Sequence, residues 1–580
     1  MKLLLTYLRK YWKLCLLVVG LATINQVFSL LDPLIFRHII DDYATKFELY
    51  SLREFFHGVV FLLLLAVGAA FVSRVAKNFQ DYFLNKVTQK LSKDVYADGV
   101  AHSLELPYAV FEDQRSGETL GTLQKVRTDS EKFIASVINV FLISLVGFLF
   151  VSIYAASIYW LIAVVYASIV PIIGGLSYVL TKKVKVIQAE ILAETTALAG
   201  STTESLRNIE LVKSLGLVDQ EVDRLNTTSD KILLLELKKL RYLRSVSFVQ
   251  GTLINLLRTL ILLFLLFLIF KQTITFGQFF SLYIYSFFIF GPLQELGSVI
   301  NNYRDTQVSF KKFQDILSMS KEPTPKKPKD VGLIKYLSFQ DVSFSYGSAN
   351  TKALEQISFS LHSGETIAFV GPSGSGKTSL VKLIVGLYEP TSGKILFNST
   401  PNSEIEMNNL RQQFGFVTQD TQLFAGTLRE NLLFVNPSAT DEECLEALEK
   451  ASANSLLERS DMGLDMRIGE GGVKVSGGEK QRISIARALL RKPKVLIFDE
   501  ATSALDSITE EAITKTIRDV GNDESRMTVL IAHRLSTIMH ADRIYVLEKG
   551  KVSETGTHEK LLESKGLYYA MWRQQIGERV

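Results

Sequence analysis

The pattern of apolar and polar positions divides the chain into two halves. Between residues 1 and about 315, six long apolar runs are separated by charged connections. From about residue 333 onward, short apolar runs alternate with stretches whose apolar residues recur at three- and four-residue spacing. Each long run approaches the ~20 residues that a helix needs to cross a bilayer, and six of them together argue against buried core helices. We therefore expect an all-α domain with six transmembrane helices, followed by an α/β domain.

The apolar runs and the connections between them also predict an orientation. The runs are Leu14 to Phe36, Val59 to Val72, Phe133 to Ile153, Ile158 to Leu180, Leu253 to Phe270 and Phe279 to Leu296. Lysine and arginine concentrate before the first run, between the second and third, and between the fourth and fifth. Because basic connections stay on the cytoplasmic side, we expect both termini and the α/β domain in the cytoplasm. The chain is then a multi-pass protein of the plasma (inner) membrane.

The two long basic connections predict helices that extend beyond the membrane. Both contain apolar residues at helical spacing among many charges, and connections of this length without structure are uncommon. Each is expected to turn in the cytosol, near Pro107–Gly117 and near Glu204–Gly216. The predicted domain boundaries are 1–317 for the membrane domain, 318–332 for a Pro- and Lys-rich linker, and 333–580 for the α/β domain.

Composition narrows the possible classes of protein. The chain has 580 residues and a net charge of +4, which is small for this length and does not indicate nucleic-acid binding. Hydrophobic residues make up 47%, and the mean hydropathy of +0.19 is high for a wholly soluble protein. The two cysteines, Cys15 and Cys444, form neither a disulfide framework nor a metal-binding pattern.

Two charged residues fall inside the predicted spans. Arg258 lies early in the fifth run and Glu295 late in the sixth, so both are expected toward the cytoplasmic side. Charges within a bilayer normally face a partner or a cavity. Arg258 and Glu295 therefore either pair with one another or line a substrate cavity, unless both reach to the membrane interface.

A phosphate-binding loop is encoded in the second half. Gly371-Pro372-Ser373-Gly374-Ser375-Gly376-Lys377-Thr378 matches the pattern G-x-x-x-x-G-K-[ST]. The apolar run Thr366–Val370 precedes it and helically spaced apolar residues follow it, which is the strand–loop–helix context that the motif requires. Backbone N–H groups of the loop would surround phosphate oxygens, Lys377 would reach the β- and γ-phosphates, and the Thr378 hydroxyl would bind Mg²⁺.

An acidic pair supplies the second nucleotide signal. The apolar run Val495–Phe498 has the character of a buried parallel strand and ends in Asp499-Glu500. A carboxylate at a strand end beside a phosphate loop is placed to hold Mg²⁺ through water. The neighbouring Glu500 is placed to orient or deprotonate an attacking water molecule.

With these motifs in place, the chain resembles the ATP-binding cassette (ABC) exporters. Val475-Ser476-Gly477-Gly478-Glu479-Lys480-Gln481-Arg482 is similar to the family's signature motif, although the family usually has Leu at position 475 and often Gln at position 479. Chemically, Ser476 can cap a helix whose first N–H groups face a γ-phosphate. The six-run layout also resembles exporters, whose coupling helices would correspond to the two predicted cytoplasmic turns.

The resemblance implies further site residues by position. Tyr346 would stack on adenine, Gln419 would sense Mg²⁺, and Ile468–Gly472 would correspond to a loop that connects the domains in exporters. Asp506, in Ser503-Ala504-Leu505-Asp506, and His533 would contact nucleotide, the histidine at the γ-phosphate. The implied sets are catalytic Glu500, His533 and Gln419; nucleotide-binding Tyr346, Gly371, Ser373, Gly374, Ser375, Gly376, Lys377, Thr378, Ser379, Ser476, Gly477, Gly478 and Asp506; and magnesium-binding Thr378, Gln419 and Asp499.

The resemblance also implies a mechanism and a partner. ATP with Mg²⁺ would lie between the phosphate loop of one copy and the signature motif of another, so that nucleotide drives alternating access in the membrane half. Nothing in the motifs requires a partner to repair a defective site, which favours a homodimer and leaves a heterodimer open. The expected activity is ATP-driven export of an amphiphilic lipid, drug or peptide; the alternative is a nucleotide-gated channel or regulatory membrane ATPase of the same layout.

Overall fold

The computed structural model describes residues 1–113, 116–347, 351–419, 421–458, 462–468, 475–500, 507–521, 525–532 and 534–576. The chain divides into two compact units. The first, the helical unit, comprises residues 1–104 and 115–319, and the second, the α/β unit, comprises residues 105–114 and 320–580. The boundaries at 317 and 333 stay predictions.

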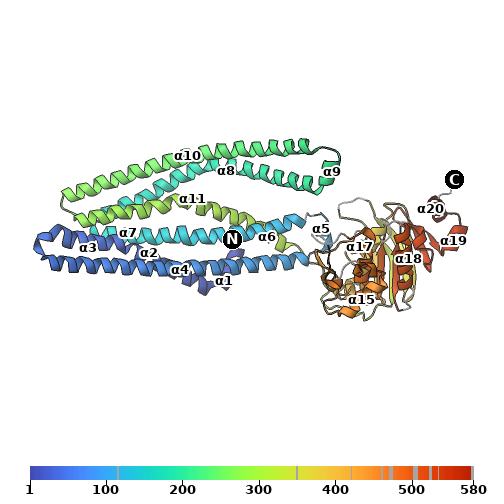
Figure 1. The fold of residues 1–580 in the computed structure, drawn as a ribbon. Helices are drawn as coiled ribbons and strands as arrows, with labels where there is room; N and C mark the ends of the chain where they lie inside the picture. Colours follow the sequence, from blue (N-terminus) through green and yellow to red (C-terminus); the bar gives the residue numbers. More distant parts are fainter. Residues whose placement is uncertain are drawn as a thin grey trace. The chain divides into compact units, whose positions relative to one another are not determined.

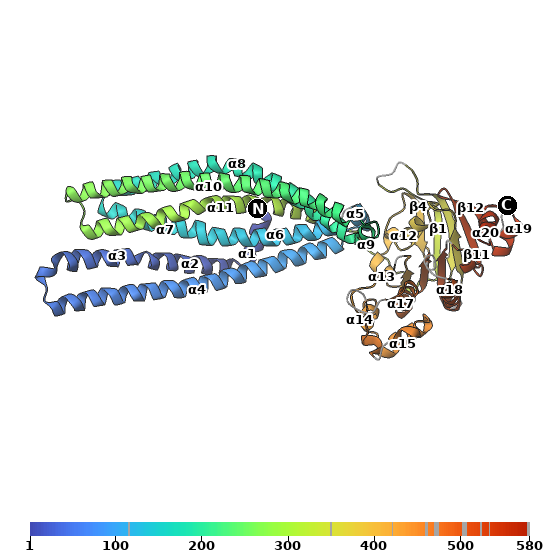
Figure 2. The same ribbon diagram turned by 45° about the horizontal axis from the view of Figure 1, so that its top comes forward.

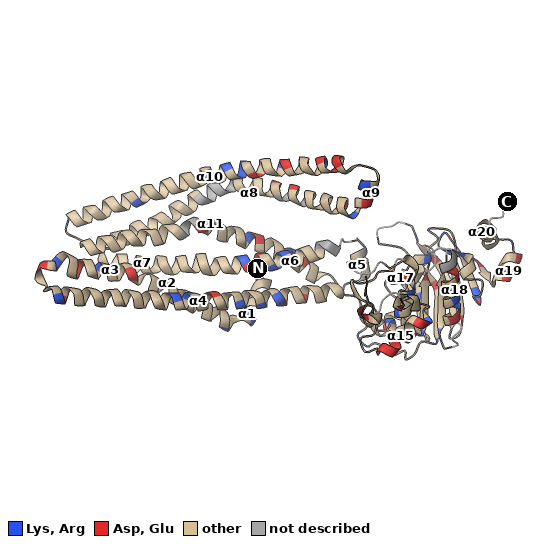
Figure 3. Ribbon diagram, viewed as in Figure 1, with Lys and Arg blue, Asp and Glu red and all other residues tan. Residues whose placement is uncertain are grey.

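The helical unit is built from helices much longer than a bilayer is thick (Figure 1). The longest are α4 (Leu52–Leu104), α8 (Trp160–Arg207), α10 (Val218–Phe270) and α11 (Phe276–Ser318). At 1.5 Å per residue, the 53 residues of α10 span roughly 80 Å, against a hydrocarbon core of about 30 Å. Figure 3 shows most charged residues of α10 in the half next to α9 (Ile209–Ser214), whereas the other half is largely apolar.

Shorter elements complete this unit. They are α1 (Lys2–Lys10), α2 (Trp12–Ser29), α3 (Leu31–His38), the π-helical η1 (Ile39–Tyr43), η2 (Ala44–Leu49), α6 (Ser116–Ser136), η3 (Val137–Leu142) and α7 (Ile143–Ile158). Helix α2 runs along α4, α6 along α11, and α8 along α10 (Figures 1 and 2). The predicted turns near 107–117 and 204–216 contain the short helices α5 (Tyr108–Asp113) and α9.

The apolar runs correspond to helical stretches in the described residues. Four are long and apolar enough to cross a membrane by length and composition: Trp12–Leu49, Leu52–Leu104, Thr119–Ile158 and Val218–Phe270. Two shorter apolar stretches, Trp160–Leu176 and Phe276–Gly291, begin α8 and α11. These stretches correspond in position to the six predicted runs, so the helical unit contains the apolar helices that a transmembrane domain requires.

Buried tyrosines tie the membrane helices together. The Tyr166 hydroxyl donates to Leu282 O at 2.7 Å, and the Tyr285 hydroxyl donates to Leu30 O at 2.6 Å. Tyr154 and Ser281 share a hydrogen bond of 2.7 Å between their hydroxyls. In an apolar environment each polar group must find a partner within the protein, so these bonds fix which helix faces pack together.

The Asp41 carboxylate, in η1, joins the start of α11 to Arg37 of α3. Its Oδ1 accepts from Gly277 N at 2.8 Å. Its Oδ2 accepts from the Thr275 hydroxyl and lies 3.6 Å from Arg37 Nε. Position 277 has no space for a side chain, because a Cβ there would lie 2.5 Å from Arg37 O and 2.6 Å from Asp41 Cγ. The close approach of the two backbones therefore requires glycine.

In its described residues, the α/β unit contains two main sheets and a short two-stranded one. The six-stranded sheet has the order β12 (Lys551–Gly556), β11 (Arg543–Glu548), β3 (Thr366–Val370), β10 (Met527–Ile531), β9 (Val495–Asp499) and β6 (Phe414–Val417), parallel except for β12. The antiparallel sheet has the order β2 (Leu354–His362), β1 (Tyr336–Phe344), β4 (Ser392–Phe397) and β5 (Thr400–Pro401). Strands β7 (Gly426–Thr427) and β8 (Arg467–Ile468) form the third.

Alternation along the central strands explains how the α/β unit is layered. Successive residues of β3 enter different cores: Ile367 and Phe369 pack with the antiparallel sheet, and Ala368 and Val370 pack with α17 (Gly477–Leu490). The remaining helices are α12 (Lys377–Ile384), α13 (Met407–Arg411), α14 (Leu428–Leu433), α15 (Asp441–Lys450), α16 (Asn454–Leu457), α18 (Ser507–Gly521), α19 (His558–Glu563) and α20 (Leu567–Gln575), with short turns η4 (Asn402–Glu404), η5 (Gly463–Asp465) and η6 (Leu535–Thr537).

Replacing Gly277 with alanine should destabilise the helical unit. The added Cβ would push α11 away from Arg37 and Asp41 and weaken the bond from Gly277 N, at a cost of about 1–3 kcal/mol of unfolding free energy. The measurement is the thermal unfolding temperature of the purified protein in detergent. Gly121→Ala is the matched control, because no atom lies within 4 Å of a Cβ built at that helical glycine. Equal unfolding temperatures for the two variants would contradict the packing argument.

Candidate functional site

The phosphate loop connects β3 to α12 and requires glycine at two close contacts. Gly371 has φ +157°, and a Cβ there would lie 2.1 Å from Leu547 O. Gly376 is the N-cap of α12 with φ +105°, where a Cβ would lie 2.7 Å from Ala353 O. The left-handed backbone and the neighbouring carbonyls therefore exclude larger residues, and the loop leads directly into a helix N-terminus.

Lys377 lies across this loop. Its ammonium donates to Gly371 O at 2.8 Å and to Pro372 O at 3.1 Å, and the residue is only 6% exposed. Burial lowers the pKa of Lys377, and the negative charges of Glu500 and Asp499 offset part of that effect. The cation is thus held at the mouth of the loop, where phosphate oxygens would replace the two carbonyls as its partners.

The acidic pair lies at the end of β9, beside the loop. Asp499 is buried, and burial followed by the charge of Glu500 raises its pKa to about 6, while Lys377 acts in the opposite direction. Glu500 has φ +48°, an uncommon conformation for a non-glycine residue, and its N–H donates to Ile531 O at 2.8 Å. Gln419 Nε2 donates to Glu500 Oε2 at 2.8 Å, so the amide after β6 holds this carboxylate in place.

The residues expected to bind magnesium fit that role. Thr378, Gln419 and Asp499 all line one cavity of about 740 Å³. Their hydroxyl, amide and carboxylate oxygens are the hard donors that Mg²⁺ takes, and the ion keeps several ligand positions for water and phosphate. Among the described residues, the buried Ser375 hydroxyl has no hydrogen-bond partner, as expected of a group that a phosphate oxygen could engage.

Tyr346 belongs to a cluster of tyrosines around one lysine. The Lys382 ammonium, on α12, lies 5.5 Å from the ring centre of Tyr346, 5.8 Å from that of Tyr388 and 5.6 Å from that of Tyr108. These distances are within the range of cation–π attraction. Tyr108 is the first residue of α5, and its ring also contacts Tyr388 at 5.9 Å between centres. Helix α5 is thereby connected to the helix that follows the phosphate loop.

The signature motif forms a capped helix start. Ser476 Oγ accepts from Glu479 N at 3.3 Å, and the Glu479 carboxylate accepts from Ser476 N at 2.7 Å. Ser476 and Gly477 are exposed, and in the described part of the chain they form no hydrogen bond to the phosphate loop. Glutamate at position 479 therefore preserves the capping geometry.

Some predicted positions lie outside the described residues. They are Asp506 with the rest of Ser503–Asp506, His533, and residues 469–472 of the loop before the signature motif. The other predicted residues are described, and the structure groups Lys377, Thr378, Gln419, Asp499 and Glu500 around the loop.

Comparison with known proteins decides the family. Residues 15–293 match the model of the ABC transporter transmembrane region, and residues 354–503 match that of the ABC transporter. The uncharacterised ABC transporter ATP-binding protein YfiC of Bacillus subtilis is 30% identical over 98% of this chain and 93% of its own length. The chain belongs to the ABC transporter family.

Two further similarities place the transporter among exporters. The ATP-dependent lipid A-core flippase of Vibrio vulnificus is 28% identical over 97% of this chain and 94% of its own. A bacterial Atm1-family ABC exporter solved with ATP bound has a TM-score of 0.85 and 26% identity, covering 98% of this chain and 99% of that chain. The transporter is thus an ATP-hydrolysing exporter, with a helical transmembrane domain followed by an ABC ATPase domain.

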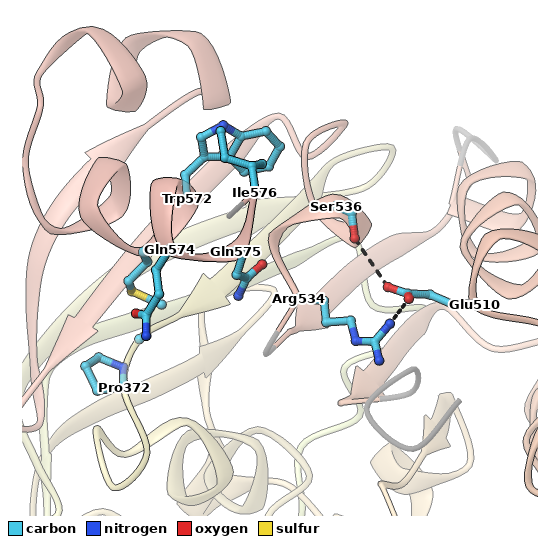
Figure 4. A pocket seen from close by; sticks show the side chains of 10 residues that line it. Pro372, Glu510, Arg534, Ser536, Trp572, Gln574, Gln575 and Ile576 are labelled. Atoms are coloured by element: carbon cyan, nitrogen blue, oxygen red, sulfur yellow. Dashed lines mark hydrogen bonds and ion pairs between the residues drawn. The ribbon is translucent and has the colours of Figure 1, made fainter. Parts of the chain in front are cut away.

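The transporter's C-terminal helix contributes contacts that the sequence did not reveal. A cavity of about 710 Å³ lies between α20, Pro372 of the phosphate loop and residues 534–536 (Figure 4). Gln575 Oε1 accepts from Leu535 N at 2.8 Å, and Glu510 contacts both Arg534 and the Ser536 hydroxyl. These bonds hold the segment that follows position 533. No sequence motif identifies Gln575 or Glu510 as the residues that make these bonds.

Lys382 and Tyr108 were also missed. Lys382 lies four residues after Thr378 and so shares its face of α12, which is a usable signal. Tyr108 lies in the first predicted cytoplasmic turn, but its aromatic contacts depend on tertiary packing.

Replacing Gln575 with alanine should slow ATP hydrolysis by this transporter. Losing one hydrogen bond to the backbone at Leu535 should lower kcat by roughly 2- to 10-fold, with a smaller effect on KM. The bond positions residues 534–536, and Gln575 itself is not expected to bind nucleotide. Gln575→Glu keeps an acceptor oxygen and should retain activity. Gln574→Ala is the control, because Gln574 lines the same cavity without bonding Leu535. Steady-state ATPase assays measure all three, and equal losses for Gln574→Ala and Gln575→Ala would contradict the positioning role.

Proposed function

We propose that two copies of this exporter form a composite ATPase whose closure drives amphiphile export. The observation that carries the proposal is the grouping of Lys377, Gln419, Asp499 and Glu500 beside the phosphate loop. It provides a cation for phosphate, oxygen ligands for magnesium and a carboxylate for water. These are the groups that phosphoryl transfer to water needs.

Within this group, Glu500 is the residue that orients the attacking water. Its carboxylate is fixed by Gln419 Nε2 at 2.8 Å, and its backbone by Ile531 O. Lys377 and the loop N–H groups would hold the β- and γ-phosphates, while Thr378 and Asp499 would hold Mg²⁺. The bound ion would neutralise the charge that develops on the phosphate oxygens. His533 completes the proposed catalytic set as the γ-phosphate contact.

The site of one copy is half of a composite site. Ser476 and Gly477 are exposed at the N-terminus of the 14-residue helix α17, where N–H groups and the helix dipole favour an anion. The phosphate loop of a second copy would bring that anion, as ATP. Since one chain supplies one loop and one signature, the homodimer is sufficient. A heterodimer is the alternative that subunit analysis would reveal.

Coupling to the membrane helices follows from chain connectivity. Tyr108 of α5 shares Lys382 with Tyr346, the residue proposed to stack on adenine. Helix α5 lies in the chain between α4 and α6. A shift of α12 or Tyr346 on nucleotide binding would therefore reach those two helices through one lysine and two tyrosine rings. The basic connections between the membrane helices support a cytoplasmic location for this machinery and both termini.

Replacing Glu500 with glutamine should separate ATP binding from hydrolysis. The variant keeps the hydrogen-bonding shape but loses the base, so hydrolysis should fall about 10²-fold or more while ATP affinity stays within about 3-fold. Glu511→Gln, on the exposed surface of α18, is the control. Uphill, ATP-dependent accumulation of an amphiphilic dye in inverted vesicles should also disappear in Glu500→Gln. Accumulation that never exceeds equilibrium in the wild type would support a gated channel.

A cross-linking experiment should detect the composite site. In a background lacking Cys15 and Cys444, Ser373→Cys and Ser476→Cys are placed on separately tagged chains, both at exposed positions. We expect ATP to promote a cross-link between the two chains that runs at twice the chain mass. A chain that remains monomeric and inactive when expressed alone would contradict the homodimer.

A further inference from the structure

The apolar half of α10 carries two different exposed faces. One face is lined by large apolar side chains, Leu256, Leu260, Leu263 and Phe267, as expected for contact with lipid acyl chains. The other contains Thr252, Asn255 and Thr259, all exposed, with the half-buried Arg258 at its edge. At 100° per residue these polar positions occupy an arc of roughly 120°. Polar groups within a span face protein or a water-filled path, so this arc does not face lipid.

The neighbouring helix α11 contributes a second exposed face, which contacts Arg258. Phe287, Gly291, Glu295 and Ser298 are exposed and follow one another at helical spacing. The two helices are joined by Arg258, whose guanidinium carbon lies 3.9 Å from the ring centre of Phe287 and 5.6 Å from that of Phe290. The face thus combines an exposed aromatic surface with a cation.

Arg258 lacks an anionic partner within the described part of the chain. Within the described residues no ion pair joins it to Glu295, so the pairing that the sequence allowed is not formed there. Its Nε is buried and has no hydrogen-bond acceptor among the described residues. It lies 12 residues before the end of α10 at Phe270, roughly 18 Å along the helix, which is too deep for the interface at that end.

The surroundings of Arg258 indicate which ligand it can take. Phe287 lies against the guanidinium, with its ring centre 3.9 Å from the central carbon, and among the described residues the terminal N–H groups form no hydrogen bond and are not buried. A guanidinium edge matches two oxygens of a carboxylate or phosphate, whereas a trimethylammonium group offers no acceptor. We propose that Arg258 recognises the anionic head group of the exported amphiphile, whose apolar part lies against Phe287. This inference rests on the proposed export function and adds the charge of its substrate.

The test compares three amphiphiles that share a dodecyl tail: dodecyl phosphate, dodecylphosphocholine and dodecyltrimethylammonium. Each is added below its micelle-forming concentration to the full-length protein in nanodiscs, and stimulation of ATP hydrolysis is titrated. For the wild type, dodecyl phosphate should reach half-maximal stimulation at a roughly tenfold lower concentration than the ammonium compound, because a charge-assisted bond is made only with the anion. Equal potency, stronger stimulation by the cation, or no stimulation by the anion would overturn the proposal.

Variants tie that preference to Arg258. Arg258→Gln should abolish the potency gap, and Arg258→Lys should retain part of the gap because it keeps the charge without the planar edge. Arg244→Gln, an exposed arginine 14 residues earlier on α10, is the matched control and should keep the gap. A gap that survives in Arg258→Gln would overturn the assignment.

Failure of this inference differs from failure of the proposed function. If Glu500→Gln hydrolysed ATP normally or uphill accumulation were absent, the exporter mechanism would be wrong whatever the substrate charge. If Glu500→Gln lost hydrolysis and the wild type accumulated the dye uphill, but the wild type showed no preference for the anion, only the role of Arg258 would be wrong.

Discussion

The parallel pairing of β3, β10 and β9 is the constraint on which the nucleotide site depends. In this register Ile531 lies between Phe369 and Asp499, so the three strands end at the same level of the sheet. The phosphate loop starts two residues after Phe369, and Glu500 follows Asp499 directly. Groups more than a hundred residues apart in sequence therefore meet because backbone hydrogen bonds align the strand ends, and a slip of one residue would separate them.

Electrostatics in this site is arranged around a buried lysine and a buried aspartate. Burial disfavours the charged form of both groups, since it lowers the pKa of Lys377 and raises that of Asp499. Their opposite charges partly offset that tendency, and Glu500 stays oriented through Gln419 rather than through the lysine. The site is thus suited to a polyanion and a divalent cation together. The polyanion would stabilise the charged form of Lys377, and the cation would stabilise the charged form of Asp499.

The sequence was most informative where local chemistry determines structure. The phosphate loop, the strands Thr366–Val370 and Val495–Asp499, and the Ser476 cap follow from glycine conformations, apolar runs and hydrogen-bonding side chains. Helix α12 ends at Ile384, and Gly386, two residues later, adopts the left-handed conformation that commonly follows a helix end. The Lys382 cluster, the Gln575 bond and the absence of an Arg258–Glu295 pair depend on distances between distant segments, which periodicity does not encode.

The length of the helices in the helical unit has a mechanical consequence. Helices α4 and α10 each continue for 53 residues, and neither contains a proline. An unbroken helix of this length behaves as a stiff rod, so that tilting it by about 5° about one end displaces the other by roughly 7 Å over its ~80 Å. A small shift of side chains at one end of such a helix can therefore produce a much larger displacement at the other end, and this displacement grows with helix length.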